Sequence, residues 1–284
     1  MQQIYYFILW LRPKQWIKNF IIFIPLIFSW NLFNFYDFKN TIIIFFIFSI
    51  FVGSTYIIND YFDIQKDKNH PTKKKRVLAS WKLNKKFALF LAIFLILLNL
   101  LLSFYFWWII FFLLFLAYLS NTFFYTIFTK NIVILDVFSI ALGFVIRWLI
   151  WIFAIWAILS EWFLLIIFFW ALLLGFLKRY QEVKLKIQTR KNIESYNEEF
   201  LKQIISMILS ILLFIYTLYT FNSVQSKLFI FTLPIVVFAI IRYYYNIFFL
   251  EKYKNSIEDI IFKDKFILFS GIFYIIFVIL IIYS

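Results

Sequence analysis

The sequence contains no cysteine and one histidine among its 284 residues. The absence of cysteine excludes disulfide bonds, thiolate nucleophiles and metal or iron–sulfur centres with cysteine ligands. A single histidine cannot form a metal site that needs several imidazole ligands. Any metal site in this chain therefore depends on oxygen ligands, which select a hard cation.

Charged residues, glycine and proline are also scarce. Charged residues make up 15% of the chain, against about 25% in an average soluble protein. Hydrophobic residues reach 65%, and the mean hydropathy is +0.91. This composition excludes a soluble globular protein and a disordered one. With four glycines and four prolines, no hinge-like segment or internal repeat divides the chain, so we expect a single membrane domain over residues 1–284.

Long apolar runs account for most of the sequence. A helix that crosses the hydrocarbon core of a bilayer, about 30 Å thick, needs roughly 20 apolar residues. Such runs fall near 20–36, 41–58, 86–104, 106–128, 132–157, 161–177, 201–221, 227–250 and 266–283. We therefore expect an all-α integral membrane protein, a bundle of nine transmembrane helices.

The basic residues indicate how this bundle is oriented. All but three of the 28 Lys and Arg residues fall before the first run or in connectors on the same side, the exceptions being Lys39, Lys227 and Arg147. By the positive-inside rule, the N-terminus and the two long connectors, about 59–85 and 178–200, are cytoplasmic. The net charge of +14 is then chiefly an orientation signal. We expect a multi-pass protein of the inner (plasma) membrane, with the lipid bilayer and not nucleic acid as its surroundings.

An acidic cluster follows the second run. Asn59, Asp60, Asp63 and Asp67 share one face if the helix continues beyond the membrane. Like charges stacked in this way repel by a few tenths of a kcal/mol per pair, which a cation between them would offset. Carboxylates together with substrate phosphates are the usual ligands of Mg²⁺. The cluster therefore predicts a magnesium site, and the alternative is a solvated helix end balanced by nearby lysines.

A cationic run, HPTKKKR, comes directly afterwards at 70–76. Its simplest interpretation is anchoring to anionic lipid headgroups, at about 1 kcal/mol per cation. Acids followed by cations in one connector also suit a magnesium–diphosphate substrate, because Lys or Arg can bind the phosphate oxygens that the metal leaves free.

Three motifs together resemble the UbiA superfamily of intramembrane prenyltransferases. These motifs are RPKQW at 12–16, NDxxDxxxD at 59–67 and HPTKxxR at 70–76. The resemblance implies a nine-helix bundle in which two polar loops on the cytoplasmic side cap a lipid-accessible cavity. A second aspartate motif, DxxxD, usually follows the sixth span in that family. Here the corresponding connector begins KRYQE at 178–182 and contains no aspartate.

This departure matches one branch of the superfamily. KRYxE followed by RKxxESY at 190–196 resembles enzymes that transfer 5-phosphoribosyl from phosphoribosyl pyrophosphate to a polyprenyl phosphate, releasing pyrophosphate, for cell-envelope polysaccharide precursors. Two positions differ from that pattern, Val77 in place of proline and Trp81 in place of glycine. A donor with phosphates at both ends and an acceptor that is itself a phosphate call for a second loop rich in Lys and Arg.

Two other functions compete with this interpretation. The first keeps the fold and moves a prenyl group from prenyl diphosphate to an aromatic or glycerol-type acceptor, but the missing second DxxxD counts against it. The second is a non-enzymatic transporter or lipid-binding protein. Transporters often have helices broken by glycine or proline near the midplane. This sequence has only four residues of each type, which counts against a transporter.

The resemblance also implies roles for particular residues. Asp60, Asp63 and Asp67 are the expected catalytic residues and the ligands of a Mg²⁺ cofactor. The expected substrate-binding residues are Asn59, Lys14, Lys73, Arg76, Arg147, Lys178, Arg179, Tyr180, Glu182, Arg190 and Tyr196. The acceptor phosphate is already an anion at neutral pH, so no general base is needed. The expected partners are phosphoribosyl pyrophosphate and polyprenyl phosphate, and a homo-oligomer is left open.

Arg147 is unusual because it lies within an apolar span, where charged side chains are costly and usually functional. It follows Asp136 by eleven residues, about three helical turns, which places both on one face of the fifth span. The pair either lines a cavity or forms ion pairs with other helices.

Overall fold

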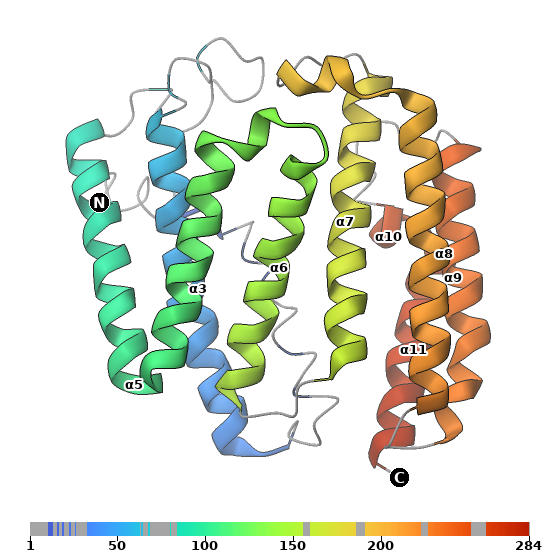
Figure 1. The fold of residues 1–284 in the computed structure, drawn as a ribbon. Helices are drawn as coiled ribbons and strands as arrows, with labels where there is room; N and C mark the ends of the chain where they lie inside the picture. Colours follow the sequence, from blue (N-terminus) through green and yellow to red (C-terminus); the bar gives the residue numbers. More distant parts are fainter. Residues whose placement is uncertain are drawn as a thin grey trace. The chain divides into compact units, whose positions relative to one another are not determined.

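The computed structural model describes residues 11–13, 16, 19, 23, 26, 33–62, 64, 68, 80, 84–155, 160–185, 191–222, 227–250 and 260–283. Within these residues the chain forms the helices shown in Figure 1. The α-helices are α3 (Phe35–Phe62), α5 (Lys85–Ile127), α6 (Leu135–Ala154), α7 (Glu161–Lys184), α8 (Glu198–Asn222), α9 (Leu233–Phe248), α10 (Ile260–Lys263) and α11 (Lys265–Tyr283). The 3₁₀ helices are η3 (Thr129–Asn131), η4 (Lys191–Ser195) and η5 (Lys227–Thr232).

The described residues contain eight segments long and apolar enough to cross a membrane. They correspond to eight of the nine expected runs, and the remaining one, 20–36, lies largely outside the described residues. The predicted all-α membrane fold is therefore confirmed, with a count of eight spans in this part of the chain.

The third and fourth expected runs, 86–104 and 106–128, correspond to a single helix, α5. A straight helix of its 43 residues would be about 65 Å long, twice the thickness of a bilayer core. Figure 1 shows instead that α5 doubles back, so that its two arms lie side by side. These arms, Lys85–Tyr105 and Ile109–Ile127, are separate candidate spans.

Polar side chains determine where several helices begin. The amide oxygen of Asn34 accepts a hydrogen bond from the backbone N–H of Tyr36 (3.0 Å), and Asn84 and Asn197 cap α5 and α8 in the same way. Such a cap satisfies a backbone donor that the first helical turn leaves unpaired. The helix α3 consequently begins at Phe35, six residues before the apolar run at 41–58.

The chain divides into two compact units. The first contains the described residues of Met1–Thr126 and Ile146–Ile158, and the second those of Ile127–Val145 and Leu159–Ser284. In the first unit, aromatic side chains form much of the core. Phe48 of α3 packs edge-on against Phe115 of α5 and Trp151 of α6, with ring centroids 5.4 and 5.5 Å apart. This edge-to-face geometry is the favoured one for aromatic pairs.

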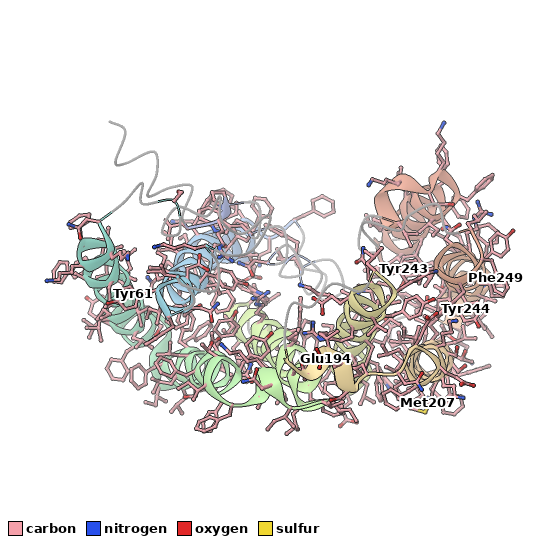
Figure 2. All side chains as sticks on the ribbon, turned by 90° about the horizontal axis from the view of Figure 1, so that it is seen from above. Tyr61, Glu194, Met207, Tyr243, Tyr244 and Phe249 are labelled. Atoms are coloured by element: carbon pink, nitrogen blue, oxygen red, sulfur yellow. The ribbon has the colours of Figure 1, made fainter. Side chains whose placement is uncertain are left out.

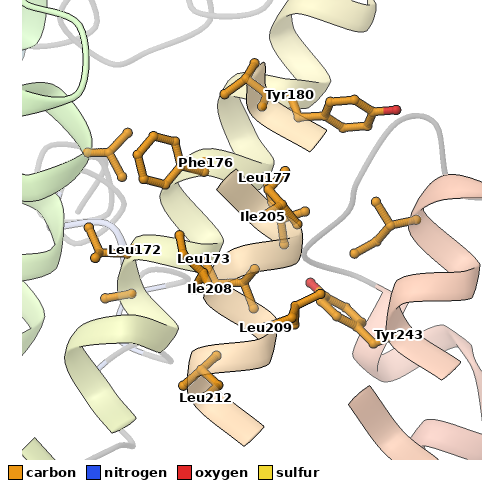
Figure 3. Packing of buried hydrophobic residues seen from close by; sticks show 14 of the residues in the cluster. Leu172, Leu173, Phe176, Leu177, Tyr180, Ile205, Ile208, Leu209, Leu212 and Tyr243 are labelled. Carbon is orange, nitrogen blue, oxygen red and sulfur yellow. The ribbon is translucent and has the colours of Figure 1, made fainter. Parts of the chain in front are cut away.

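The core of the second unit is mainly aliphatic and centres on α7 and α8 (Figure 3). Leu173 and Leu177 of α7 face Ile205 and Ile208 of α8, and all four are almost completely buried. Tyr243 of α9 joins the same cluster. Burying side chains of this size stabilises the fold by about 1.5–3 kcal/mol each. This packing therefore holds the C-terminal part of α7, which carries several candidate site residues, in place.

Large apolar side chains also cover much of the outer surface. Met207 of α8 is 52% exposed, and Figure 2 shows it on the outer side of its helix. Phe221 and Phe269 are similarly exposed on α8 and α11. A soluble monomer rarely exposes so much contiguous apolar surface, whereas a bilayer would cover it.

Candidate active site

In the first unit, Asp60 lies in the last turn of α3, where the sequence predicts an acidic cluster. The Nη2 atom of Arg12 donates to both carboxylate oxygens of Asp60, at 2.5 Å each. The Arg12 guanidinium also lies over the ring of Tyr56, 5.1 Å from its centroid. The side chain of Arg12 is 24% exposed and that of Asp60 is 3% exposed. The ion pair is thus open to solvent on the arginine side.

The position of Arg12 depends on a close approach between Leu11 and α3. A Cβ atom added at Gly53 would lie 2.8 Å from the backbone oxygen of Leu11, so only glycine leaves room for the chain to pass there. The indole N–H of Trp16 donates to the same oxygen (3.1 Å). Arg12 itself has a positive φ of 53°, an uncommon conformation for a residue with a side chain. Local backbone geometry therefore directs Arg12 toward Asp60.

Asn59 lies beside Asp60 and contacts α5. The hydroxyl of Thr126 donates to the amide oxygen of Asn59 (3.1 Å). This bond joins the end of α3 to the end of the second arm of α5. The amide oxygen of Asn59 is thereby engaged within the protein.

A three-carboxylate metal site can be only partly examined. Of the three predicted ligands, Asp60 is described, whereas Asp63 and Asp67 lie outside the described residues. The described part of the chain alone contains no group of three or more metal-ligating side chains. Asp60 supplies the type of oxygen ligand that Mg²⁺ prefers, at a helix end, and in this structure Arg12 contacts both of its carboxylate oxygens. The magnesium site remains a prediction.

Arg147 is buried in the first unit. Its Nη2 atom donates to the hydroxyl of Tyr118 (2.6 Å), and its guanidinium lies 5.3 Å from the centroid of that ring. Asp136, on the same helix, belongs to the second unit and has different partners. The sequence left two alternatives, residues that line a cavity or residues that form ion pairs with other helices. Arg147 binds the hydroxyls of Tyr118 and Tyr56. Asp136 forms an ion pair with Arg179 of another helix.

In the second unit, Asp136 is the centre of a buried polar network. The Nε atom of Arg179, from α7, donates to Oδ2 of Asp136 at 2.7 Å. Nη1 of the same arginine donates to Glu182 at 2.5 Å, one turn along α7. The side chains of Arg179 and Asp136 are both fully buried. Two of the predicted substrate-binding residues, Arg179 and Glu182, are therefore brought together, and both are bound within the protein.

Tyr196 completes this network. Its hydroxyl donates to Oδ1 of Asp136 and accepts from the backbone N–H of Ile134, both at 2.8 Å. Ile134 has a positive φ of 71°, which is strained for a β-branched residue. Burial raises the pKa of the Tyr196 hydroxyl above its ordinary value, and the hydrogen bond to Asp136 raises it further. Tyr196 thus holds the segment after η4 against the start of α6.

A second close approach lies beside this network. A Cβ atom at Gly175 of α7 would lie 2.5 Å from a methyl group of Val137, the residue after Asp136. The absence of a side chain at Gly175 therefore allows α7 to approach α6 closely enough for Arg179, one turn further on, to reach Asp136.

The other predicted residues of α7 differ in exposure. Lys178 is exposed. Tyr180 is 2% exposed and packs against Phe248, with ring centroids 5.4 Å apart. The ammonium group of Lys184 lies over the ring of Tyr180, 5.7 Å from its centroid. The predicted contact of Tyr180 with a ligand stays a prediction.

A separate polar group connects α9 with the start of α11. Asp264 accepts from Arg242 (3.0 Å) and Asn246 (2.9 Å), and its other oxygen accepts from the backbone N–H groups of Phe266 and Ile267. Burial alone would raise the pKa of Asp264, but the hydrogen bonds from Arg242 and Asn246 outweigh it, so its pKa is lowered. Asp264 therefore acts as the N-terminal cap of α11.

Several predicted site residues cannot be placed. The following lie outside the described residues: Lys14, Asp63, Asp67, Lys73, Arg76 and Arg190. Conversely, the structure identifies two residues to which the sequence assigned no binding role. Arg12 belongs to the RPKQW motif, so the motif itself could have indicated it. Nothing in the sequence indicates that Tyr118 contacts Arg147, because 29 residues separate them.

The fold and these polar groups define an all-helical, multi-pass membrane protein with charged clusters near helix ends. The model of the UbiA prenyltransferase family matches residues 20–270. The chain therefore belongs to the UbiA prenyltransferase family. The resemblance seen in the sequence motifs is thereby confirmed.

Relatives and a solved structure agree with this assignment. The decaprenyl-phosphate phosphoribosyltransferase of Corynebacterium glutamicum is 30% identical over 222 residues, which cover 76% of this chain and 67% of that protein. The enzyme of the same name from Mycolicibacterium smegmatis is 28% identical over 219 residues, 74% of this chain and 69% of that one. The structure of a UbiA homolog from Archaeoglobus fulgidus bound to DMAPP and Mg²⁺ has a TM-score of 0.70 at 15% identity, covering 96% of this chain and 98% of that one. This last likeness concerns the fold alone.

Proposed function

We propose that this protein transfers the 5-phosphoribosyl group of phosphoribosyl pyrophosphate to a polyprenyl phosphate and releases pyrophosphate. The observation that carries the proposal is the extended similarity to proteins named decaprenyl-phosphate phosphoribosyltransferase, over about three quarters of the chain. The acid-free connector after α7, with Lys178 and Arg179 in place of a second aspartate motif, supports the same substrates.

In this proposal, Asp60, Asp63 and Asp67 hold Mg²⁺ on the diphosphate of the donor. The metal, when bound, supplies stabilisation of the negative charge that develops on the leaving pyrophosphate. The geometry described for the first unit gives Arg12 a related role. Its guanidinium, held over Tyr56 at the carboxylate of Asp60, is suited to bind a diphosphate oxygen next to that carboxylate.

The basic side chains bind and orient the remaining phosphates. Lys178 is exposed at the end of α7, and Lys73, Arg76 and Arg190 are proposed to act in the same way. Holding donor and acceptor in line lowers the entropic part of the barrier. The acceptor phosphate attacks C1 of the ribose as an anion, so the protein needs no residue to remove a proton. Arg179, Glu182 and Tyr196 act indirectly, by fixing the ends of α6 and α7.

A transfer assay tests the proposal directly. Membranes that contain the protein are supplied with Mg²⁺, labelled phosphoribosyl pyrophosphate and a polyprenyl phosphate, and label is measured in the lipid phase. We expect label in the lipid phase that depends on both the protein and the metal. Membranes that lack the protein serve as the control.

A parallel reaction addresses the competing activity. The same membranes are given a labelled prenyl diphosphate and an aromatic acid. Conversion of these substrates, with no transfer from phosphoribosyl pyrophosphate, would overturn the proposal and assign prenyl transfer instead.

A further inference from the structure

Tyr56 of α3 contacts two arginines of the first unit. The guanidinium carbon of Arg12 lies over its ring, 5.1 Å from the centroid. Its hydroxyl accepts a hydrogen bond from the buried Arg147 of α6. Tyr56 also precedes Asp60 by four residues, so the two side chains project from the same face of α3. One side chain therefore joins both guanidinium groups next to the acidic end of the helix.

The hydroxyl of Tyr56 is held on its buried side. Arg147 is 5% exposed, and its Nη2 atom also donates to the hydroxyl of Tyr118 on the second arm of α5, at 2.6 Å. Tyr118 is itself buried and packs edge-on against Phe48, with ring centroids 5.2 Å apart. Residues of α3, α5 and α6 thus meet at this pair of hydroxyls. Displacement of the Tyr56 side chain would take an acceptor away from a buried charge, which is costly.

The ring of Tyr56 lies on the side that is open to solvent. Tyr56 is half-buried, and the side chain of Arg12 is 24% exposed. Among the described contacts, the Arg12 guanidinium is held by this ring and by the carboxylate of Asp60. Both hydrogen bonds to Asp60 come from Nη2. The donors on Nε and Nη1 of Arg12 are therefore not used by Asp60.

The two contacts of Arg12 respond differently to a ligand. A diphosphate competes for the guanidinium donors, and its metal competes for the carboxylate oxygens of Asp60. The attraction between a cation and an aromatic face needs no acceptor oxygen, so neither ligand displaces it. The ring of Tyr56 can therefore keep the guanidinium in place while its donors exchange one anion for another.

We infer that Tyr56 is a positioning residue whose ring holds Arg12 for the diphosphate and whose hydroxyl is anchored by Arg147. This inference deepens the proposed function and rests on the role given there to Arg12. It assigns the buried Arg147 an indirect part in phosphate binding, exerted through Tyr56. All of these residues belong to the first unit. None of the sequence motifs includes Tyr56.

Two substitutions separate the ring from the hydroxyl. Tyr56→Phe keeps the ring beneath Arg12 and removes the acceptor of Arg147, whereas Tyr56→Leu removes the ring as well. The matched controls are Tyr36→Phe and Tyr36→Leu, at the exposed start of the same helix. We expect both controls to bind pyrophosphate and to turn over like the wild type.

Binding of pyrophosphate provides a measurement that does not depend on turnover. Isothermal titration of the purified full-length protein with pyrophosphate, at fixed Mg²⁺, gives the dissociation constant of each variant. We expect Tyr56→Leu to weaken binding by about tenfold, as the loss of a cation–π contact predicts, and Tyr56→Phe to weaken it by less. The melting temperature without ligand should change little for Tyr56→Phe, because Arg147 keeps the hydroxyl of Tyr118.

A double-mutant cycle identifies the residues through which Tyr56 acts. In an Arg12→Gln background, Tyr56→Leu should cause no further loss of pyrophosphate affinity. Tyr56→Phe combined with Arg147→Met should weaken binding by no more than the larger single effect. A purely structural role of Tyr56 would instead give losses that persist without Arg12 and that follow the melting temperature.

Unchanged pyrophosphate affinity in folded Tyr56→Leu would overturn the inference, as would a loss that persists in the Arg12→Gln background. If Tyr56→Leu does not fold, the cycle of Tyr56→Phe with Arg147→Met decides, and additive losses there would overturn it. All of these results leave the proposed function intact, because transfer from phosphoribosyl pyrophosphate is measured separately. Absence of that transfer in the wild type would overturn the proposed function alone, since a prenyl donor also carries a diphosphate.

Discussion

The two units each contain an aspartate bound by an arginine, but the two pairs differ in exposure. In the first unit, the side chain of Arg12 is 24% exposed where it binds Asp60. In the second unit, Arg179 and Asp136 are completely buried, and Tyr196 occupies the remaining oxygen of Asp136. Both sites also contain a residue with positive φ and a glycine at a close approach, to the backbone of Leu11 in the first unit and to the side chain of Val137 in the second. Similar components therefore form an open pair at Asp60 and a closed pair at Asp136.

This difference in exposure suggests different roles for the two carboxylates, ligand binding for Asp60 and stabilisation of the fold for Asp136. A carboxylate whose partner is partly exposed can exchange that partner for a ligand at modest cost, because solvent stabilises the released arginine. A carboxylate sealed among protein donors cannot do so without leaving a buried charge uncompensated. We therefore expect variants of Asp60 to affect turnover and variants of Asp136 to affect folding.

The largest effect is expected for Asp136→Leu. This change leaves the buried Arg179 with Glu182 as its remaining carboxylate partner and leaves its Nε atom and the Tyr196 hydroxyl without the acceptor they share, so it should lower the free energy of unfolding by about 3 kcal/mol. The measurement is the yield of monodisperse protein after extraction together with its melting temperature. The triple variant Asp136→Leu/Arg179→Met/Glu182→Gln removes all three charged groups of the network and should recover most of the stability. If Asp136→Leu folds normally but does not turn over, Asp136 belongs with the ligand-binding acids.

Asp60→Asn should have the opposite profile. We expect kcat/KM to fall by about 100-fold or more, as when a group that stabilises transition-state charge is removed, while the melting temperature changes little. Asp63→Ala is expected to behave in the same way, since the sequence assigns it to the same metal site. Asp37→Asn, at the other end of α3, is the control and should remain active. Near-normal activity of both acid variants would remove the metal site from the proposed mechanism.

Substitution of Arg147 tests whether this buried arginine, like Arg179, chiefly stabilises the fold. Its described partners include the neutral hydroxyls of Tyr118 and Tyr56, so Arg147→Met removes a buried charge without exposing a carboxylate in these contacts. Replacing a buried charged group with an apolar one is often neutral or stabilising. We expect an unchanged or higher melting temperature and a fall of about tenfold or more in the rate of phosphoribosyl transfer. Lys227→Met, at an exposed position, is the control, and marked unfolding of Arg147→Met alone would give Arg147 a structural role like that of Arg179.

The smallest effect is expected for Tyr196→Phe. Loss of one hydroxyl removes two hydrogen bonds, for about 1–2 kcal/mol of stability. Because the pKa of Tyr196 is raised on folding, its contribution is complete below the ordinary tyrosine value of about 10 and is lost as the pH rises toward the raised value. Melting temperatures between pH 8 and 12 should therefore converge for the wild type and the variant. Parallel curves would contradict this, and Tyr245→Phe, on an exposed part of α9, serves as the control.

The sequence predicts the spans well because the bilayer imposes one rule on all of them. Hydropathy failed mainly at helix ends, where polar side chains decide. The helix α3 starts early because Asn34 caps it, and α7 continues to Lys184, beyond the apolar run at 161–177. Along that extension Arg179 is buried, since its charge is compensated by Asp136, a residue 43 positions away. Hydropathy considers each segment alone and cannot include such a partner.

The sequence predicts which residues are candidates for the site, but it does not predict which of them contact one another. Asp60, Arg179, Glu182 and Tyr196 were identified from motifs, but the motifs do not state which residues bind a ligand and which bind one another. That distinction depends on burial and on long-range pairing.

The backbone of Arg12 places opposing demands on that position. At a φ of 53°, glycine is accommodated without strain, whereas most other residues cost about 1 kcal/mol or more. When Asp60 is also replaced by an apolar residue, so that no buried carboxylate loses its partner, glycine or asparagine at position 12 should raise heat resistance. In a screen for turnover, arginine should persist despite the strain. The residue found at position 12 in related proteins would then indicate whether they were selected more strongly for stability or for catalysis.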